Sequence, residues 1–236
     1  LVNNASGASL TMSRGTKFTT TVDGQSYSFV NNADVSITPT DGVYKFSNLK
    51  IHEGSYLNYK YTVSTSDIDQ RFIIPNDSVD TTTLTVKIQE SSSDATTNTY
   101  TLASGITGLD STSKVYFLQE VEGGRFEVYF GDGVLGKAVA DGNIVILDYI
   151  NTNRDAPNGA TSFTLSGTVG GFSNATITTI SNAAGGTGLE SIASIKYNAP
   201  RDYSAQDRAV TAEDYKTLVK SLYANAQAVQ VYGGED

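Results

Sequence analysis

The segment 130–137 contains the residues whose types and spacing come closest to a known chemical motif. Its sequence is Phe-Gly-Asp-Gly-Val-Leu-Gly-Lys, so its glycines follow the G-x-G-x-x-G spacing of dinucleotide-binding loops. The same stretch matches a P-loop except at the last position, where Ala138 replaces the Ser or Thr that would hold magnesium. In either motif, backbone N–H groups of the loop would bind phosphate oxygens.

The residues on both sides of these glycines argue against a phosphate-binding loop. Both motifs require a helix that begins at the glycines, because its N-terminus supplies the N–H groups. Asp141-Gly142-Asn143 is a turn signal that ends the segment before a helix could form. Alternating runs at 125–130 and 144–149 are typical of strands. We therefore interpret the segment as a structural turn between strands, built by Gly131, Asp132, Gly133 and Gly136.

Other catalytic residues are scarce. The chain has no cysteine and one histidine, which excludes thiolate catalysis, cysteine zinc sites and multi-histidine metal centres. His52 would have to serve a Ser-His-Asp triad without any G-x-S-x-G elbow in the sequence. Asp67 and Asp69 could pair as glycosidase carboxylates, although sequence gives no criterion for their separation. We expect a protein that is not an enzyme and has no cofactor or metal.

Charge and hydropathy disfavour two classes of binding partner. The formal net charge of −9, without a Lys/Arg cluster, disfavours nucleic acid and anionic lipid surfaces. No apolar stretch approaches the roughly 20 residues that span a bilayer. We expect no nucleic-acid partner and no membrane partner. The chain starts at Leu1 without an initiator methionine, and we expect it to be a fragment of a longer protein.

Short alternating runs separated by turn residues dominate the first part of the chain. The runs 17–22 and 25–30 are rich in Thr, Tyr, Phe and Val, and Asp23-Gly24 between them is a hairpin signal. Many such strands predict a β-sandwich or barrel. The polar stretch 91–98 has no residue that could anchor a core, and we interpret it as a loop or domain linker.

The predicted fold class is mainly β with a C-terminal α/β portion. We expect a β-sandwich-like domain at 1–82, a second β-rich domain with the Gly-Asp-Gly turn at 83–182, and a small α/β tail at 183–236. Glycines just after the second boundary would permit a hinge, at Gly185, Gly186 and Gly188.

The predicted tail contains two helices and a strand. Apolar positions three residues apart from Leu189 onwards suit a short helix, and Pro200 would end it. A second helix is better supported, because Thr211 followed three positions later by Asp214 fits a capping box. Arg208, with Arg201, could pair with acidic neighbours to fix the start of this helix, namely Asp214, Glu213 or Glu190. A strand at 228–232 would close the tail.

Apolar residues of the second helix recur at helical spacing and form one stripe. These candidate interface or packing residues are Tyr215, Leu218, Val219, Leu222 and Tyr223. Such a stripe either packs on the local sheet or contacts a partner, and both alternatives are open.

Three stretches of the chain together carry a resemblance to a known family. They are 130–137 with Gly142-Asn143-Ile144 and Asp148-Tyr149; Gly185-Gly186 with Leu189-Glu190-Ser191-Ile192 and Ala199-Pro200; and Arg208-Ala209-Val210-Thr211-Ala212-Glu213-Asp214-Tyr215. In this order they resemble the baseplate-J family of contractile phage tails and related injection machines. The stretches at 14–16 and 72–76 are also similar to its β-domain, whereas 151–161 follows the family pattern only loosely. The chain looks most like the ring-forming wedge subunits of T-even-type phages.

The resemblance implies a structural role in the virion. Family subunits of this kind pair within a wedge and join wedges into a ring around the central hub, which rearranges when the tail contracts. The implied partners are a second copy of the chain, as a homodimer and a higher ring, and other baseplate wedge and hub proteins. The implied location is the virion tail baseplate, assembled in the host cytoplasm.

The alternative interpretation is an adhesin or carbohydrate-binding module of a phage or cell surface. Thr/Tyr-rich β-sandwiches with acidic loops commonly hold sugars or calcium. The chain has no tryptophan for a sugar platform and no EF-hand calcium loop, which weakens this alternative.

Overall fold

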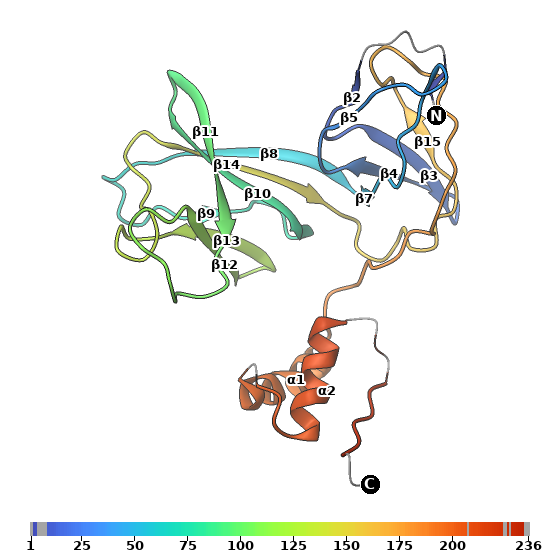
Figure 1. Ribbon diagram of the computed structural model, residues 1–236. Helices are drawn as coiled ribbons and strands as arrows, with labels where there is room; N and C mark the ends of the chain where they lie inside the picture. Colours follow the sequence, from blue (N-terminus) through green and yellow to red (C-terminus); the bar gives the residue numbers. More distant parts are fainter. Residues whose placement is uncertain (1, 4–8, 207, 224–225, 227, 234–236) are drawn as a thin grey trace. The chain divides into compact units, whose positions relative to one another are not determined.

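The chain folds into two compact units in the computed structural model, which describes residues 2–3, 9–206, 208–223, 226 and 228–233 (Figure 1). Leu1–Ala184 form unit 1 and Gly185–Asp236 form unit 2. The strands of unit 1 are β1 (Val2–Asn3), β2 (Leu10–Met12), β3 (Lys17–Val22), β4 (Gln25–Asn31), β5 (Val35–Ile37), β6 (Val43–Tyr44), β7 (Ile51–Glu53), β8 (Ser55–Thr62), β9 (Phe72–Ile73), β10 (Val79–Ser91), β11 (Asp94–Leu102), β12 (Val115–Val121), β13 (Arg125–Phe130), β14 (Ile144–Asn151) and β15 (Thr164–Ser166).

The largest sheet of unit 1 curves into a nearly closed barrel. Its strand order is β8-β14-β10-β11-β12-β13-β9, and every pair is antiparallel except the two-residue pairing of β11 with β12. The outer strands β8 and β9 approach each other, since the Tyr61 hydroxyl donates a hydrogen bond to the Ile73 carbonyl. The rings of Tyr61 and Phe72 also meet edge to face, 5.6 Å apart. We call this sheet the barrel.

Strand β14 lies between β8 and β10 and is buried on both faces. Val145, Leu147 and Tyr149 point into the barrel core, where they join Val86 and Val128. The alternate residues of β14 face the other way, as the two-residue period of a strand requires. This outward face is also covered, and it carries the charged residue Asp148 with 3% exposure.

The second core of unit 1 lies between smaller sheets. Strands β15-β3-β4-β7 form one sheet and β2-β5 another, and the predicted Asp23-Gly24 hairpin connects β3 to β4. The core contains Met12, Phe18 and Phe29, and Phe163 packs edge to face on Phe29 at 4.9 Å. We call this part the N-terminal sheets.

Strand pairing crosses the predicted domain boundary at residue 82 in both directions. Strands β8 and β9, which precede it, belong to the barrel, and β15, which follows it, pairs with β3. The boundary itself stays a prediction. The interpretation of 91–98 as a loop or linker is wrong, because β10 and β11 form a hairpin there with Ser91 opposite Asp94. Polar Thr-rich strands fit a half-exposed sheet surface, so the lack of core residues did not indicate a loop.

Unit 2 is helical in its described residues. It contains α1 (Ile192–Ala205) and α2 (Ala212–Leu222), which contact each other. The helix α1 continues through Pro200, contrary to the prediction that Pro200 ends it. The predicted strand at 228–232 is also wrong, since these residues have no strand pairing and so no hydrogen-bonded ladder. The mainly β fold class with C-terminal helices is confirmed, but the tail lacks its expected strand.

Neither described helix has the length and hydropathy that a membrane crossing needs.

Candidate interaction surfaces

The predicted structural turn lies in the connection between β13 and β14, which packs tightly. A side chain at Gly131 would place its Cβ 2.3 Å from the Leu135 carbonyl oxygen, so only glycine fits there. Asp132 accepts hydrogen bonds from the backbone N–H groups of Val134 and Leu135, both at 2.9 Å. These two bonds lower the pKa of Asp132 below its ordinary value. Gly136 adopts a positive φ of 93°.

The backbone N–H groups of this connection are used inside the protein. Gly133 N–H donates to the Gly136 carbonyl, Gly136 N–H to the Asp110 carbonyl, and Lys137 N–H to the Ser113 carbonyl. The Asp110 carboxylate is held in turn by the Ser113 and Thr112 hydroxyls, which lower its pKa to about 2. No helix follows within 131–143, and these N–H groups do not face an open site. The geometry offers no cradle for a phosphate.

The titratable residues that the sequence singled out do not assemble into a catalytic group. His52 lies on β7, and its Nδ1 atom is 3.9 Å from an Asp80 carboxylate oxygen. Asp67 accepts a hydrogen bond from the backbone N–H of Asp69, in the connection between β8 and β9. Across the part of the chain that the structure describes, no cluster of three or more His, Asp or Glu side chains could hold a metal ion.

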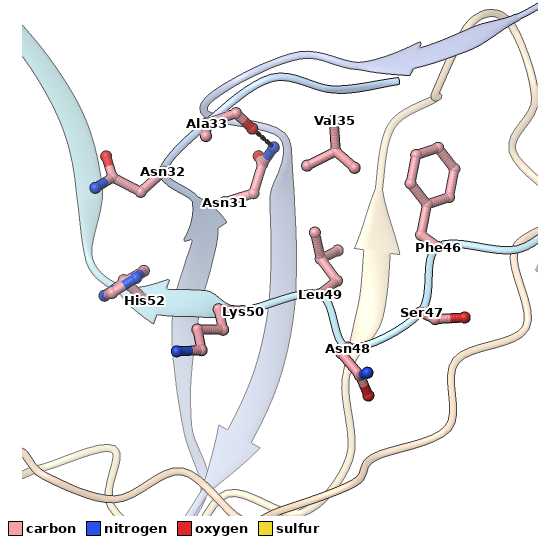
Figure 2. Close-up of a pocket in the computed structure, with 10 residues that line it drawn as sticks. All are labelled: Asn31, Asn32, Ala33, Val35, Phe46, Ser47, Asn48, Leu49, Lys50 and His52. Atoms are coloured by element: carbon pink, nitrogen blue, oxygen red, sulfur yellow. Dashed lines mark hydrogen bonds between the residues drawn. The ribbon is translucent and has the colours of Figure 1, made fainter. Parts of the chain in front are cut away.

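A cavity of about 340 Å³ lies beside β7, between the segments 31–35 and 46–52. Val35, Phe46 and Leu49 form its apolar wall (Figure 2). The polar side chains around it diverge, because Lys50 and His52 extend to one side and Asn48 to the other. A small-molecule site needs polar groups that converge on the ligand, and this cavity does not supply them.

The start of α2 is built as a capping box. The Thr211 hydroxyl accepts from the Asp214 backbone N–H, and the Asp214 carboxylate accepts from the Thr211 backbone N–H at 2.8 Å. This hydrogen bond from Thr211 is the largest cause that lowers the pKa of Asp214. The predicted pairing of these arginines with acidic residues stays a prediction. The charge of Arg208 interacts with Asp214 and that of Arg201 with Glu213. Their hydrogen bonds go elsewhere, since the guanidinium of Arg208 donates to Gln206 and that of Arg201 donates to the Tyr197 carbonyl. The Arg201 guanidinium also stacks on the Tyr197 ring, 3.6 Å from its centre.

Most of the apolar stripe of α2 is exposed. Leu222 is 86% exposed and Tyr215 48%, while Leu218 is half-buried. The other exposed stripe residues are Val219 and Tyr223. The helix α1 likewise exposes large apolar residues, including Ile192 and Tyr203. The described part of unit 2 has no sheet on which the stripe could pack, so these side chains are exposed apolar groups that a partner could cover.

The predicted hinge glycines lie between β15 and α1, in a segment without helix or strand. Gly185 is the first residue of unit 2 and has a φ of 97°. Gly186 and Gly188 follow it before the N-cap of α1 at Ser191. Their role as a hinge stays a prediction.

Sequence reasoning missed one cluster, centred on Asp148. The carboxylate is buried on the outward face of the barrel and contacts Arg14, Lys87 and Asn58. The sequence does carry a signal, because Asp148 is the single charged residue in the apolar run 144–150. A charge inside such a run requires partners, which sequence alone does not identify.

Two comparisons with known proteins place the chain near baseplate proteins, and the first of them is located on the barrel. Residues 59–158 match the family model described as "Bacteriophage baseplate wedge protein gp6, third domain". The chain is also similar to baseplate wedge protein gp6 of Enterobacteria phage T4, with 29% identity over 148 residues, which is 52% of this chain and 22% of that protein. The chain thus spans about a fifth of the length of this relative. Neither match concerns the baseplate-J family, so that resemblance stays a prediction. The two matches show a similarity to baseplate wedge protein gp6, and residues 59–158 are the part similar to its third domain.

Proposed function

We propose that the chain is a structural subunit of a bacteriophage tail baseplate wedge, and that it associates with a second copy of itself through unit 2. The observation that carries the proposal is the exposed apolar stripe of α2, on a chain whose barrel matches a baseplate wedge domain. The subunit would reside in the virion tail baseplate and be assembled in the host cytoplasm. Other wedge and hub proteins would be its further partners.

The composition of the apolar stripe of α2 is typical of the centre of a protein–protein interface. Exposed apolar side chains gain free energy when a partner removes them from water, at roughly 25 cal/mol per Å² of apolar surface. Interface cores are enriched in aromatic residues and poor in charge, and the stripe combines Tyr215 and Tyr223 with aliphatic residues. A homodimer that places one α2 stripe against the other would be self-complementary, as a two-fold interface must be.

The exposed apolar surface of unit 2 would also join subunits into a ring. In this proposal the barrel and the N-terminal sheets act as rigid spacers, and unit 2 joins subunits within and between wedges. A rearrangement during tail contraction would use the glycines at 185, 186 and 188 as the hinge between the units. We propose no reaction and no cofactor for the chain.

Sedimentation velocity over a wide concentration range tests the association. We expect a reversible dimer for the unsubstituted chain and a dissociation constant at least tenfold higher for Leu222→Asp, because a charge would have to be buried in the interface. Ile68→Asp is the matched control: Ile68 is 92% exposed, but it lies in unit 1. The control should dimerise like the unsubstituted chain.

Two results would contradict the proposal. One is a monomer at every concentration, which would leave the stripe without its second copy. The other is an equal loss of dimer in both variants, which would attribute the effect to charge in general. Because Leu222 is the last residue of α2 and exposed, Leu222→Asp should keep the helix, and far-UV circular dichroism checks this.

A further inference from the structure

The register of the barrel gathers one polar cluster on the outward face of β14. Asp148 lies opposite Asn58 of β8 and opposite Thr85 of β10. Tyr56 lies two residues before Asn58, and Lys87 lies two residues after Thr85. Both are therefore on the same face of the sheet as Asp148. We call Asp148, Asn58, Tyr56, Lys87 and Thr85 the Asp148 cluster.

The Asp148 carboxylate is bound from several directions. Asn58 donates to one oxygen at 2.6 Å and the Lys87 ammonium to the other at 3.1 Å. Burial would raise the pKa of Asp148, but hydrogen bonds from Asn58 and Tyr56 and the nearby Lys87 charge lower it overall, so the group is a carboxylate. Burial, with the hydrogen bond to this carboxylate, raises the pKa of Tyr56 to about 12.

Arg14 reaches this cluster from the N-terminal sheets. It follows β2, and its Nη1 atom lies 3.6 Å from an Asp148 oxygen. Its Nη2 atom donates to Thr85 of the barrel at 3.2 Å and to Asn32 of the N-terminal sheets at 3.0 Å. The guanidinium also lies over the Tyr56 ring, 4.6 Å from its centre. One side chain thus contacts both parts of unit 1.

We propose that Arg14 is a latch that couples the N-terminal sheets to the barrel, so that the two cores of unit 1 move and unfold as one body. Arg14 is the cluster contact that comes from outside the barrel, since Tyr56, Asn58, Thr85, Lys87 and Asp148 belong to barrel strands. The proposal rests on these contacts and does not depend on the proposed function.

Near Arg14, the backbone of the N-terminal sheets lies close to the backbone of the barrel. The Gly54 N–H donates to the Ser28 carbonyl of β4, where β7 passes into β8. A Cβ at Gly54 would lie 2.3 Å from the Asn151 carbonyl oxygen, so no other residue fits between the N-terminal sheets and β14. Nearby, Asn153 donates two hydrogen bonds to the Glu53 carboxylate, at 2.7 and 2.8 Å. The junction therefore has little room for a sliding motion.

The energetics favour a role in coupling more than in net stability. A buried ion pair often contributes little to stability because desolvation offsets the attraction, whereas removal of one partner leaves a costly unpaired charge. The Arg14 Nε atom is buried without a hydrogen-bond partner, which adds to the desolvation cost. What the planar guanidinium does supply is a fixed geometry between groups on two parts of the chain.

Hydrogen exchange of the whole chain, read by mass spectrometry, tests the latch. In the unsubstituted chain, peptides from β3–β4 and peptides from β14 should exchange through the same opening. In Arg14→Met we expect the β3–β4 peptides to exchange at least tenfold faster relative to β14, because the N-terminal sheets then open alone. Lys87→Met is the matched control, since it also removes one cation from Asp148 but lies within the barrel. It should change both regions by the same factor.

A second variant separates coupling from stability. Asp148→Asn added to Arg14→Met removes the buried carboxylate that has lost one of its two cations, and we expect it to recover thermal stability without restoring the common opening. The latch is overturned if Arg14→Met accelerates both regions equally, if Lys87→Met separates them as strongly, or if the unsubstituted chain already exchanges in two independent regions.

Discussion

Unit 1, which is built of strands, buries its large apolar residues, whereas the helical unit 2 exposes many of its own. Unit 1 buries Leu147, Ile74 and Val128 completely, within the nearly closed barrel. Unit 2 fully buries few large side chains, and Ala205 is the buried residue of α1. Unit 1 thus carries its own stabilisation, whereas the apolar surface of unit 2 is available to a partner.

This contrast separates two kinds of evidence about function. The barrel is the part that matches a known domain, and its residues are explained by packing and hydrogen bonding. The helices lie outside the matched range, and their exposed residues are not explained by packing within the described residues. The matched domain shows what the barrel is similar to, and the exposed helices are the basis of the association proposed above.

The largest expected effect tests the contrast directly with the same substitution in both units. Leu147→Ala should lower the free energy of unfolding by about 3 kcal/mol, because it leaves a cavity in the closed barrel core. Leu222→Ala should change it by less than about 0.5 kcal/mol, as exposed substitutions do. Urea unfolding of the dilute, monomeric chain measures both. Equal losses would mean that Leu222 packs inside unit 2 and that the contrast is false.

The sequence predicted elements well where local pattern and turn chemistry agree. The β3–β4 hairpin and the capping box of α2 follow from Asp23-Gly24 and from Thr211 with Asp214. It failed where a distant partner decides the structure. The run 94–98 becomes a strand because Gln89 and Ile88 of β10 pair with it, and 228–232 stays irregular because no strand pairs with it.

The candidate sites show the same limit. The glycine turn was recognisable because its spacing lies within eight residues, but the partners of Asp148 are 61 to 134 positions away, as Lys87 and Arg14 illustrate. Pro200 misled because proline removes one backbone hydrogen bond without always ending a helix. Pro200 is exposed and stays within the helix.

An intermediate effect concerns the glycine turn between β13 and β14. Gly131→Ala should lower the free energy of unfolding by roughly 1–3 kcal/mol, because its Cβ would meet the Leu135 and Gly136 carbonyl oxygens within 2.4 Å. Gly105→Ala is the control, since a Cβ there meets nothing within 4 Å and its φ is not positive. Thermal unfolding compares the two. A tolerated Gly131→Ala would show that this connection is loose, and would weaken the view of unit 1 as a rigid body.

The smallest expected effect concerns the N-cap of α2 in unit 2. Thr211→Ala removes the capping hydroxyl and should destabilise α2 by about 1 kcal/mol. This corresponds to roughly fivefold faster hydrogen exchange in peptides from 212–222, with unit 1 unchanged. Thr217→Ala, in the interior of the same helix, is the control and should slow exchange slightly, because alanine is the better helix former.

The dependence of hydrogen exchange on protein concentration tests whether association stabilises α2. If a second copy binds the stripe, association stabilises the folded helix, and exchange of peptides from 212–222 should slow as dimer forms, by the same factor in Thr211→Ala and in the unsubstituted chain. An exchange rate of these peptides that is the same at all concentrations would mean that α2 forms independently of association. In that case unit 2 would resemble unit 1 in supplying its own stability, and its exposed apolar residues would need another explanation than a second copy.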